Sequence, residues 1–206
     1  MTPANGHGIQ LHHGSNRLVI PAYGKISADY NSSSGSCVLY SDDHGLTWAV
    51  TGEFGLDTAE GDVAELMDGS VLYTLRSDDP NIQSECFPYQ HCMMSARSFD
   101  HGTTFENLIY QSALVDSGCK GGISSFVDDG TIVFVNSANA VARSDVTLRI
   151  SRDEGRTWYG SQLIYDGKSG YVDVDTSVQG GQKYAHVVFE KAELSIMYAQ
   201  LPVEAP

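Results

Sequence analysis

The octet Ser41-Asp42-Asp43-His44-Gly45-Leu46-Thr47-Trp48 is the first of three similar segments in this chain of 206 residues. The second octet covers 98–105 and the third covers 151–158, so the three begin 57 and 53 residues apart. All three follow the pattern Ser-x-Asp-x-Gly-x-Thr-aromatic. A repeat at a nearly constant interval of this length is typical of a protein built from successive copies of one structural unit.

The residue types of the octet predict a tight turn. An aspartate carboxylate accepts hydrogen bonds from backbone N–H groups of its own turn, and a glycine supplies a position with positive φ. The aromatic residue is expected to pack beneath the turn at the start of the following strand. We therefore interpret Asp43, Asp100 and Asp153 as turn-forming residues and not as catalysts.

Stretches with the composition of β-strands lie between the octets, and no segment has the pattern of a helix. The expected strands are 8–11, 17–23, 36–41 and one following Trp48; 62–66, 71–75, 93–98 and one near Phe105; 122–127, 131–135, 147–151 and 158–164; and 171–178, 184–189 and 194–199. Four antiparallel strands in each repeated unit are the signature of propeller blades. The sequence thus predicts an all-β fold in which residues 1–206 form part of a β-propeller. We expect three full blades near 8–55, 60–112 and 121–166 and a partial blade near 170–201.

Charge and hydropathy exclude some partners. The formal net charge is −14, which argues against a nucleic acid or an anionic membrane surface because both require a basic face. An anionic ligand would then depend on a local cluster of arginines. No apolar run approaches the length of a membrane span, and the first residues lack the apolar region of a signal peptide. Compartment and oligomeric state remain open.

Cysteine and histidine residues give weaker signals. Cys86 and Cys92 have five residues between them. They would pair in an oxidising compartment, and free thiols are an equally good interpretation. The cysteine spacing does not fit a structural zinc site. Four histidines show no ligand spacing and are interpreted as structural; these are His7, His12, His13 and His186. We therefore expect no metal and no cofactor.

The segment 59–76 predicts a hairpin that turns at Asp68-Gly69, a dipeptide that tolerates positive φ. Glu60 stands at its entrance and Arg76 at its exit, so both are expected at the same end of the hairpin. Taken alone, such a pair is more often a solvated salt bridge that contributes well under ~1 kcal/mol.

Several segments together resemble the exo-α-sialidase (neuraminidase) family, whose fold is a six-bladed β-propeller. The octets resemble the Asp-boxes, or bacterial neuraminidase repeats, of that family. Residues 6–11 and 17–23 resemble its GHGIQL…GRLVIPAY segment, and 60–76 resembles NECQVVELxDGxLLLNxR. Residues 136–149 resemble SNPA…R…LTVR, 169–171 resemble SAYS, and 188–190 resemble LLYE. The order and spacing of these segments cover nearly the whole chain.

The resemblance implies a role for five residues. Tyr171 would be the nucleophile that attacks the anomeric carbon of sialic acid, and Glu60 would take its phenolic proton. Arg76 and Arg143 would be two of the three arginines that hold the substrate carboxylate, and Glu190 would orient the third. As alternatives, Tyr171 could be a packed strand residue, Arg143 a loop cation and Glu190 a strand-end carboxylate.

The residue types fit the chemistry of this sugar. Sialic acid carries a carboxylate on its anomeric carbon, so an anionic nucleophile would be repelled, whereas a neutral phenol is not. An ordinary tyrosine titrates near pH ~10 and therefore needs a base within hydrogen-bond reach. The planar guanidinium of arginine can donate two parallel hydrogen bonds to a carboxylate.

The chain also departs from the family pattern. In the family an R-I-P segment carries the first arginine, and an aspartate that serves as acid/base follows it; both precede GHGIQL, where this chain starts. We therefore expect the chain to be the C-terminal portion of a longer protein. Residues 116–122 stand in place of DPxCQGS, Gly61-Asp62 stand in place of CQ, and Phe105 stands where an Asp-box tryptophan is usual.

Two functions follow from different classes. One is a retaining exo-sialidase acting on sialylated glycoconjugates, and the other is a truncated, non-catalytic propeller fragment or sialic-acid-binding module. Asp-boxes combined with unrelated chemistry are disfavoured, because Asp-boxes alone would not bring Glu60, Arg76, Arg143 and Tyr171 in family order.

Overall fold

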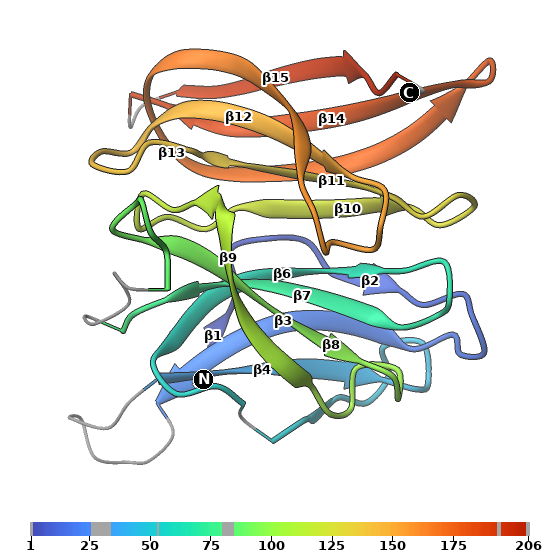
Figure 1. Cartoon of the computed structure of the whole chain (residues 1–206). Helices are drawn as coiled ribbons and strands as arrows, with labels where there is room; N and C mark the ends of the chain where they lie inside the picture. The colour runs from blue at the N-terminus through green and yellow to red at the C-terminus, as the bar shows by residue number, and fades with distance from the viewer. Residues whose placement is uncertain (1, 26–33, 53, 80–84, 193–194, 205–206) are drawn as a thin grey trace.

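The structure, a computed structural model, describes residues 2–25, 34–52, 54–79, 85–192 and 195–204. These residues form strands, turns and connecting segments, and none of them is helical. Figure 1 shows the strands arranged as sheets stacked one on another, from the N-terminal residues to the C-terminal ones. No helix in these ranges is long and apolar enough to cross a membrane.

The first two sheets are antiparallel. The first sheet contains β1 (Thr2–Pro3), β2 (Ile9–Gln10), β3 (Leu18–Lys25), β4 (Ser34–Ser41) and β5 (Ala49–Val50). Both β1 and β2 pair with β3, which is followed by β4 and β5. The second sheet has the order β6 (Thr58–Glu65), β7 (Val71–Ser77), β8 (Cys92–Ser98) and β9 (Glu106–Val115). The strand expected after Trp48 is only two residues long.

The remaining strands follow in the order β10 (Gly122–Phe126), β11 (Thr131–Ser137), β12 (Ser144–Ser151), β13 (Tyr159–Gln179), β14 (Gln182–Lys191) and β15 (Ser195–Pro202). The separate strands expected at 158–164 and 171–178 are wrong, because β13 runs through both. Its first half pairs with β12 and its second half with β14. We call β10, β11, β12 and the first half of β13 the third sheet, and the second half of β13 with β14 and β15 the fourth. Residue 194 of the strand expected at 194–199 lies outside the described residues.

The core lies between successive sheets, because alternate residues of a strand face opposite sides. On β7, Val71, Tyr73 and Leu75 pack toward the first sheet, whereas Leu72 packs toward the third. On β11, Ile132 and Phe134 face the second sheet. Val133 and Val135 alternate with them and face the fourth sheet, where they meet Val172, Val174, Val187 and Phe189. The inner strands of the second and third sheets, β6, β7, β10 and β11, are thus buried on both faces.

The three octets form the same turn. Thr47 donates its N–H to Asp43 at 2.8 Å and its hydroxyl at 2.6 Å, and the equivalent bonds join Thr104 to Asp100 and Thr157 to Asp153. These contacts agree with turn-forming aspartates. The aromatic residues differ in burial: the Trp48 side chain is 45% exposed, whereas Phe105 stacks on Phe54.

Cys86 and Cys92 form a disulfide, which selects one of the two interpretations of their spacing. Cys37 and Cys119 lie outside this disulfide, and both are buried.

Candidate active site

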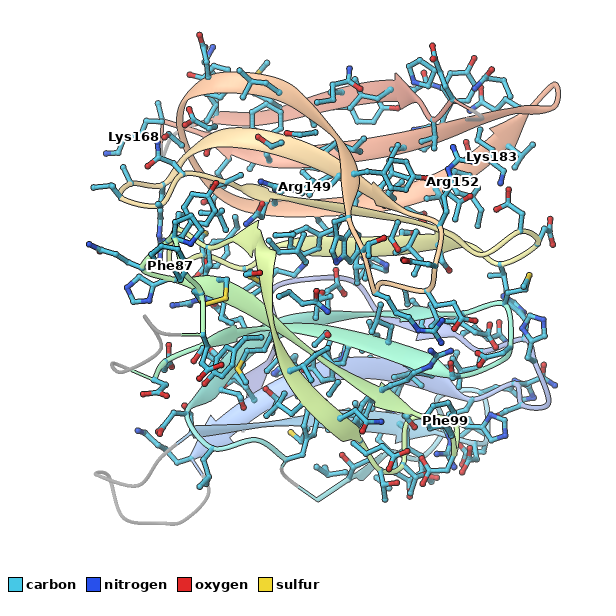
Figure 2. All side chains as sticks on the ribbon, in the orientation of Figure 1. Phe87, Phe99, Arg149, Arg152, Lys168 and Lys183 are labelled. Atoms are coloured by element: carbon cyan, nitrogen blue, oxygen red, sulfur yellow. A yellow bond between two sulfur atoms is a disulfide. The ribbon has the colours of Figure 1, made fainter. Side chains whose placement is uncertain are left out.

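The hairpin β6–β7 carries Glu60 and Arg76 to one end of the stacked sheets. Its turn has Gly69 at a φ of 82°, with the Gly69 N–H donating to the carbonyl of Leu66 at 2.9 Å. The octets lie at the opposite end. Figure 2 labels Phe99 and Arg152, which belong to octets, at that end, and Phe87 and Lys168 at the other. The turn residues and the candidate catalytic residues are therefore well separated.

Glu60 is the centre of the candidate site. Its side chain is nearly buried, and three groups converge on its carboxylate. Tyr171 donates its phenolic O–H to Oε1 at 2.9 Å, and Asn5 donates its amide to the same oxygen at 2.7 Å. Arg76 donates from Nη1 to Oε2 at 2.6 Å. The structure thus joins two predicted site residues directly to a third.

Tyr171 is held in the second half of β13 by its own backbone. The Tyr171 N–H donates to Oε2 of Glu190 at 3.0 Å. Gly170 makes this contact possible, because a Cβ at that position would lie 2.1 Å from the same oxygen. Burial and the hydrogen bond to Glu60 raise the pKa of the Tyr171 phenol. The phenol therefore stays neutral until a proton acceptor takes its proton.

The two predicted arginines lie on either side of this pair. Burial opposes the charge of Arg76, but the hydrogen bond to Glu60 and the nearby Asp116 and Asp78 outweigh it and raise the pKa of Arg76. Its Nε is buried and has no hydrogen-bond partner among the described residues. Arg143 is exposed, donates to the carbonyl of Gly118 at 2.6 Å, and lies 5.8 Å from the centroid of the Tyr171 ring.

A cavity of about 420 Å³ opens beside Arg76. It is lined by Arg76, Asp78, Asp116, Ser117 and Val141, among others. The hydroxyl of Ser117 is buried and has no hydrogen-bond partner among the described residues. The cavity wall therefore combines the cation of Arg76 with the carboxylates of Asp78, Asp79 and Asp116.

A cluster of four charged residues lies next to this site, and the sequence interpretation did not include it. The Nζ of Lys120 lies 3.0 Å from Asp62 and 3.1 Å from Asp173. The Nδ1 of His7 lies 3.1 Å from Asp173 and 3.6 Å from Asp62. The side chains of Asp62 and Lys120 are fully buried, whereas those of His7 and Asp173 are partly exposed.

The titration of the cluster follows from these contacts. The hydrogen bond to Asp173 raises the pKa of His7 to about 9, against the effect of burial. Burial raises the pKa of Asp62 to about 6 even though Lys120 and His7 lie beside it. Burial also opposes the charge of Asp173, but the hydrogen bond to His7 and the charge of Lys120 outweigh it and lower the pKa of Asp173.

His7, Asp62 and Asp173 could together hold a metal ion, because one ligand atom from each lies within 4.8 Å of the others. The ammonium group of Lys120, however, already bridges the two carboxylates. A cation of the protein itself thus takes the position that a metal ion would need.

The sequence contained one usable signal for these additional residues. Asn5 and His7, Glu60 and Asp62, and Tyr171 and Asp173 are pairs two positions apart, and such residues share a face of an extended chain. His7 was interpreted as a histidine without ligand spacing because its partners, Asp62 and Asp173, are 55 and 166 positions away in the sequence. The other three histidines of that group contact different residues: His12 and His13 meet Glu65, and His186 meets Ser177 and Tyr198.

Residues 1–196 match the family described as the BNR repeat-like domain. The chain belongs to this family. It is 29% identical over 181 residues to a sialidase of Micromonospora viridifaciens, covering 82% of this chain and 26% of that protein. It is 34% identical over 132 residues to Sialidase-3 of Homo sapiens, covering 59% of this chain and 29% of that protein. The chain thus spans less than a third of the length of these relatives.

Solved structures show the same architecture. A Hadza microbial sialidase superposes with a TM-score of 0.80 at 21% identity, covering 98% of this chain and 37% of that one. Trypanosoma rangeli sialidase, in a covalent intermediate with 2,3-difluorosialic acid, gives a TM-score of 0.62 at 19% identity, covering 91% of this chain and 29% of that one. The predicted fold class is therefore confirmed: the chain has the all-β architecture of part of a sialidase propeller.

Proposed function

We propose that this chain carries the nucleophile and part of the carboxylate-binding site of a retaining exo-α-sialidase. The substrate would be a terminal sialic acid on a glycoprotein, a glycolipid or an oligosaccharide. The observation that carries the proposal is the hydrogen bond of 2.9 Å from the Tyr171 phenol to the Glu60 carboxylate. The similarity to proteins named sialidases supports the substrate class.

The geometry supports a specific order of proton and bond changes. The Tyr171 oxygen attacks the anomeric carbon while its proton passes to Oε1 of Glu60, and the bond to the leaving oxygen breaks as the aspartate that the family resemblance places before the segment 6–11 protonates that oxygen. Arg76 holds the other carboxylate oxygen, Oε2, through a hydrogen bond of 2.6 Å. Water, giving one proton to that aspartate, then attacks the anomeric carbon, and Glu60 returns its proton to the departing Tyr171 oxygen. Two displacements at the same carbon give retention of configuration.

The arginines account for binding of the substrate carboxylate. Arg76 has a buried Nε without a described partner, and Arg143 lies over the Tyr171 ring. A guanidinium group binds a carboxylate through paired hydrogen bonds. In this role the two arginines offset the formal net charge of −14, which otherwise repels an anionic sugar.

A second candidate is a sialic-acid-binding module without catalysis. The observation that favours it is that both carboxylates adjoining Tyr171 are occupied. Glu60 accepts bonds from three side chains, and Glu190 accepts from the Tyr171 backbone. Neither is then available to protonate a leaving alcohol. The family resemblance assigns that proton to an aspartate preceding the segment 6–11.

Hydrolysis of a fluorogenic sialoside by the purified chain separates the two candidates. Tyr171→Phe removes the nucleophile, and Tyr198→Phe changes an exposed tyrosine of the fourth sheet as a matched control. The enzymatic proposal expects turnover that is lost in Tyr171→Phe alone, and a fluorinated sialosyl probe that labels Tyr171 in mass spectra. Binding of sialic acid that needs Arg76, with neither turnover nor labelling, would instead select the binding module.

A further inference from the structure

We propose that Lys120 is a positioning residue whose ammonium group holds strands β6 and β13 at the separation that brings Tyr171 into contact with Glu60. Where it concerns catalysis, the inference rests on the proposed function. As a statement about the distance between two side chains, it can be tested without turnover.

The two strands need such a link because they do not pair. β6 belongs to the second sheet and pairs only with β7, whereas the second half of β13 belongs to the fourth sheet and pairs with β14. The third sheet lies between them, and its strand β10 contacts both. Lys120 precedes β10, and its Nζ reaches Asp62 on β6 and Asp173 on β13 at 3.0 and 3.1 Å.

The contacts form two adjacent layers. The first layer joins Asn5, Glu60 and Tyr171, and the second joins His7, Asp62 and Asp173. Asp62 and Asp173 each follow their first-layer counterpart by two positions, which is the repeat of an extended chain, whereas the chain bends between Asn5 and His7. Only the second layer has a cation at its centre. A change in the spacing of the second layer is therefore transmitted directly to the first.

Two departures from the family pattern meet at this cation. Asp62 stands where the CQ pattern has glutamine, and Lys120 stands where DPxCQGS has glutamine. The two positions are 58 residues apart in sequence, yet their side chains contact each other. The two side chains form a fully buried ion pair. Removing one partner of such a pair leaves an uncompensated charge, whereas replacing both does not.

Gly6 completes the enclosure of Lys120. A Cβ on Gly6 would lie 2.4 Å from Nζ, so an alanine there must displace the ammonium group. Gly6 is exposed and has no positive φ that would disfavour alanine. Gly6→Ala consequently moves the cation without changing any charge and without removing a buried side chain.

The test places a single 3-fluorotyrosine at position 171 and follows its titration by ¹⁹F NMR. Fluorination lowers the phenol pKa, which keeps the titration within the pH range of the folded protein. The direction of the change in the Tyr171 pKa distinguishes a displaced phenol from a lost charge, because the two effects have opposite signs. Loss of a nearby cation raises the pKa of a phenol, whereas loss of the hydrogen bond to Glu60 lowers it.

In Lys120→Gln and in Gly6→Ala we expect the phenol pKa to fall by about one unit. In the double variant Asp62→Gln/Lys120→Gln, which removes the ammonium group without leaving Asp62 as an unpaired charge, we expect the same fall. Glu65→Gln is the matched control, since it neutralises another buried carboxylate of β6 that binds the backbone of His12 and His13. There we expect no shift.

A phenol pKa that rises or stays constant in Lys120→Gln would overturn the proposal, because the cation would then act only through its charge. If Lys120→Gln does not fold, Gly6→Ala decides, and an unchanged titration in that variant also overturns it. Neither reading depends on hydrolysis, so failure of the sialidase proposal is a separate result. In a preparation that turns over, Gly6→Ala should lower kcat up to ~100-fold with a smaller change in KM.

Discussion

The phenol of Tyr171 donates to Glu60 at 2.9 Å although the two residues are 111 positions apart and lie on strands that do not pair. Glu60→Gln keeps the size of the side chain and removes its ability to accept the phenolic proton. We expect the phenol pKa to fall, because a neutral amide no longer opposes ionisation. We expect sialoside cleavage to slow by about 10²–10⁴-fold, the usual contribution of a general base.

The two measurements are a pH titration of the phenol and single-turnover cleavage of a fluorogenic sialoside. A phenol that ionises more easily would normally be a better nucleophile, so a lower pKa with a lower rate identifies Glu60 as the proton acceptor. A lower pKa with an unchanged or higher rate would contradict that role.

The ion pair between His7 and Asp173 predicts a stability that depends on pH. The pKa of His7 is raised from 6.5 to about 9, so the folded chain holds its proton more tightly than the unfolded chain does. The resulting stability is fully present below pH 6.5 and is lost as the pH rises through 9. Its size is at most about 3 kcal/mol. The pKa of Asp173 is lowered, so this carboxyl titrates in the acidic range. Its contribution to the free energy of unfolding is therefore constant between pH 6.5 and 9.

Urea unfolding of the native chain and of His7→Asn at pH 6 and at pH 9.5 measures this effect. The native chain should lose free energy of unfolding between the two pH values, and the variant should lose much less. His12→Asn is the control, because the contact of His12 with Glu65 uses its backbone N–H. An equal pH dependence in His7→Asn and in the native chain would refute the prediction.

Much of the fold could be predicted from local patterns. The Ser-x-Asp-x-Gly-x-Thr octets mark one turn in each unit. An apolar run such as Val71-Leu72-Tyr73 marks a strand that is buried on both faces. The continuity of β13 could not be predicted in the same way. Residues 165–170 contain polar side chains and two glycines, which read as a loop, whereas pairing with β12 and β14 keeps them extended.

The candidate site, like the fold, could be predicted from the sequence only in part. Glu60, Arg76, Arg143 and Tyr171 were identified by resemblance, and the structure places them near one another. The cluster around Lys120 was not, because a buried lysine is rare and its two partners, Asp62 and Asp173, come from two distant segments. The departures at Asp62 and Lys120 were visible in the sequence. Only the fold shows that they compensate each other.

Asp153 should matter for stability and not for chemistry. Its carboxylate accepts from Ser151 and twice from Thr157 at the octet end of the sheets. Asp153→Ala removes all three bonds, and we expect a loss of about 0.5–1.5 kcal/mol, since Thr157 is exposed and its N–H and hydroxyl can donate to water instead. Thermal unfolding measures the loss. The titration of Tyr171 should stay constant, and a shift there would show that the two ends of the sheets are coupled.

Gly170 should be intolerant of a side chain because of its position between Tyr171 and Glu190. A Cβ would lie 2.1 Å from Oε2 of Glu190 and 3.3 Å from its Cβ, so the carboxylate must leave the Tyr171 N–H. Gly170→Ala is expected to cost about 1–3 kcal/mol, because a backbone donor loses its acceptor. It should also reduce labelling of Tyr171 by a fluorinated sialosyl probe. Gly52→Ala is the control, since a Cβ there would have no neighbour within 4 Å. If both alanine variants unfold at the temperature of the native chain and label equally well, Glu190 does not hold the backbone of the nucleophile in place.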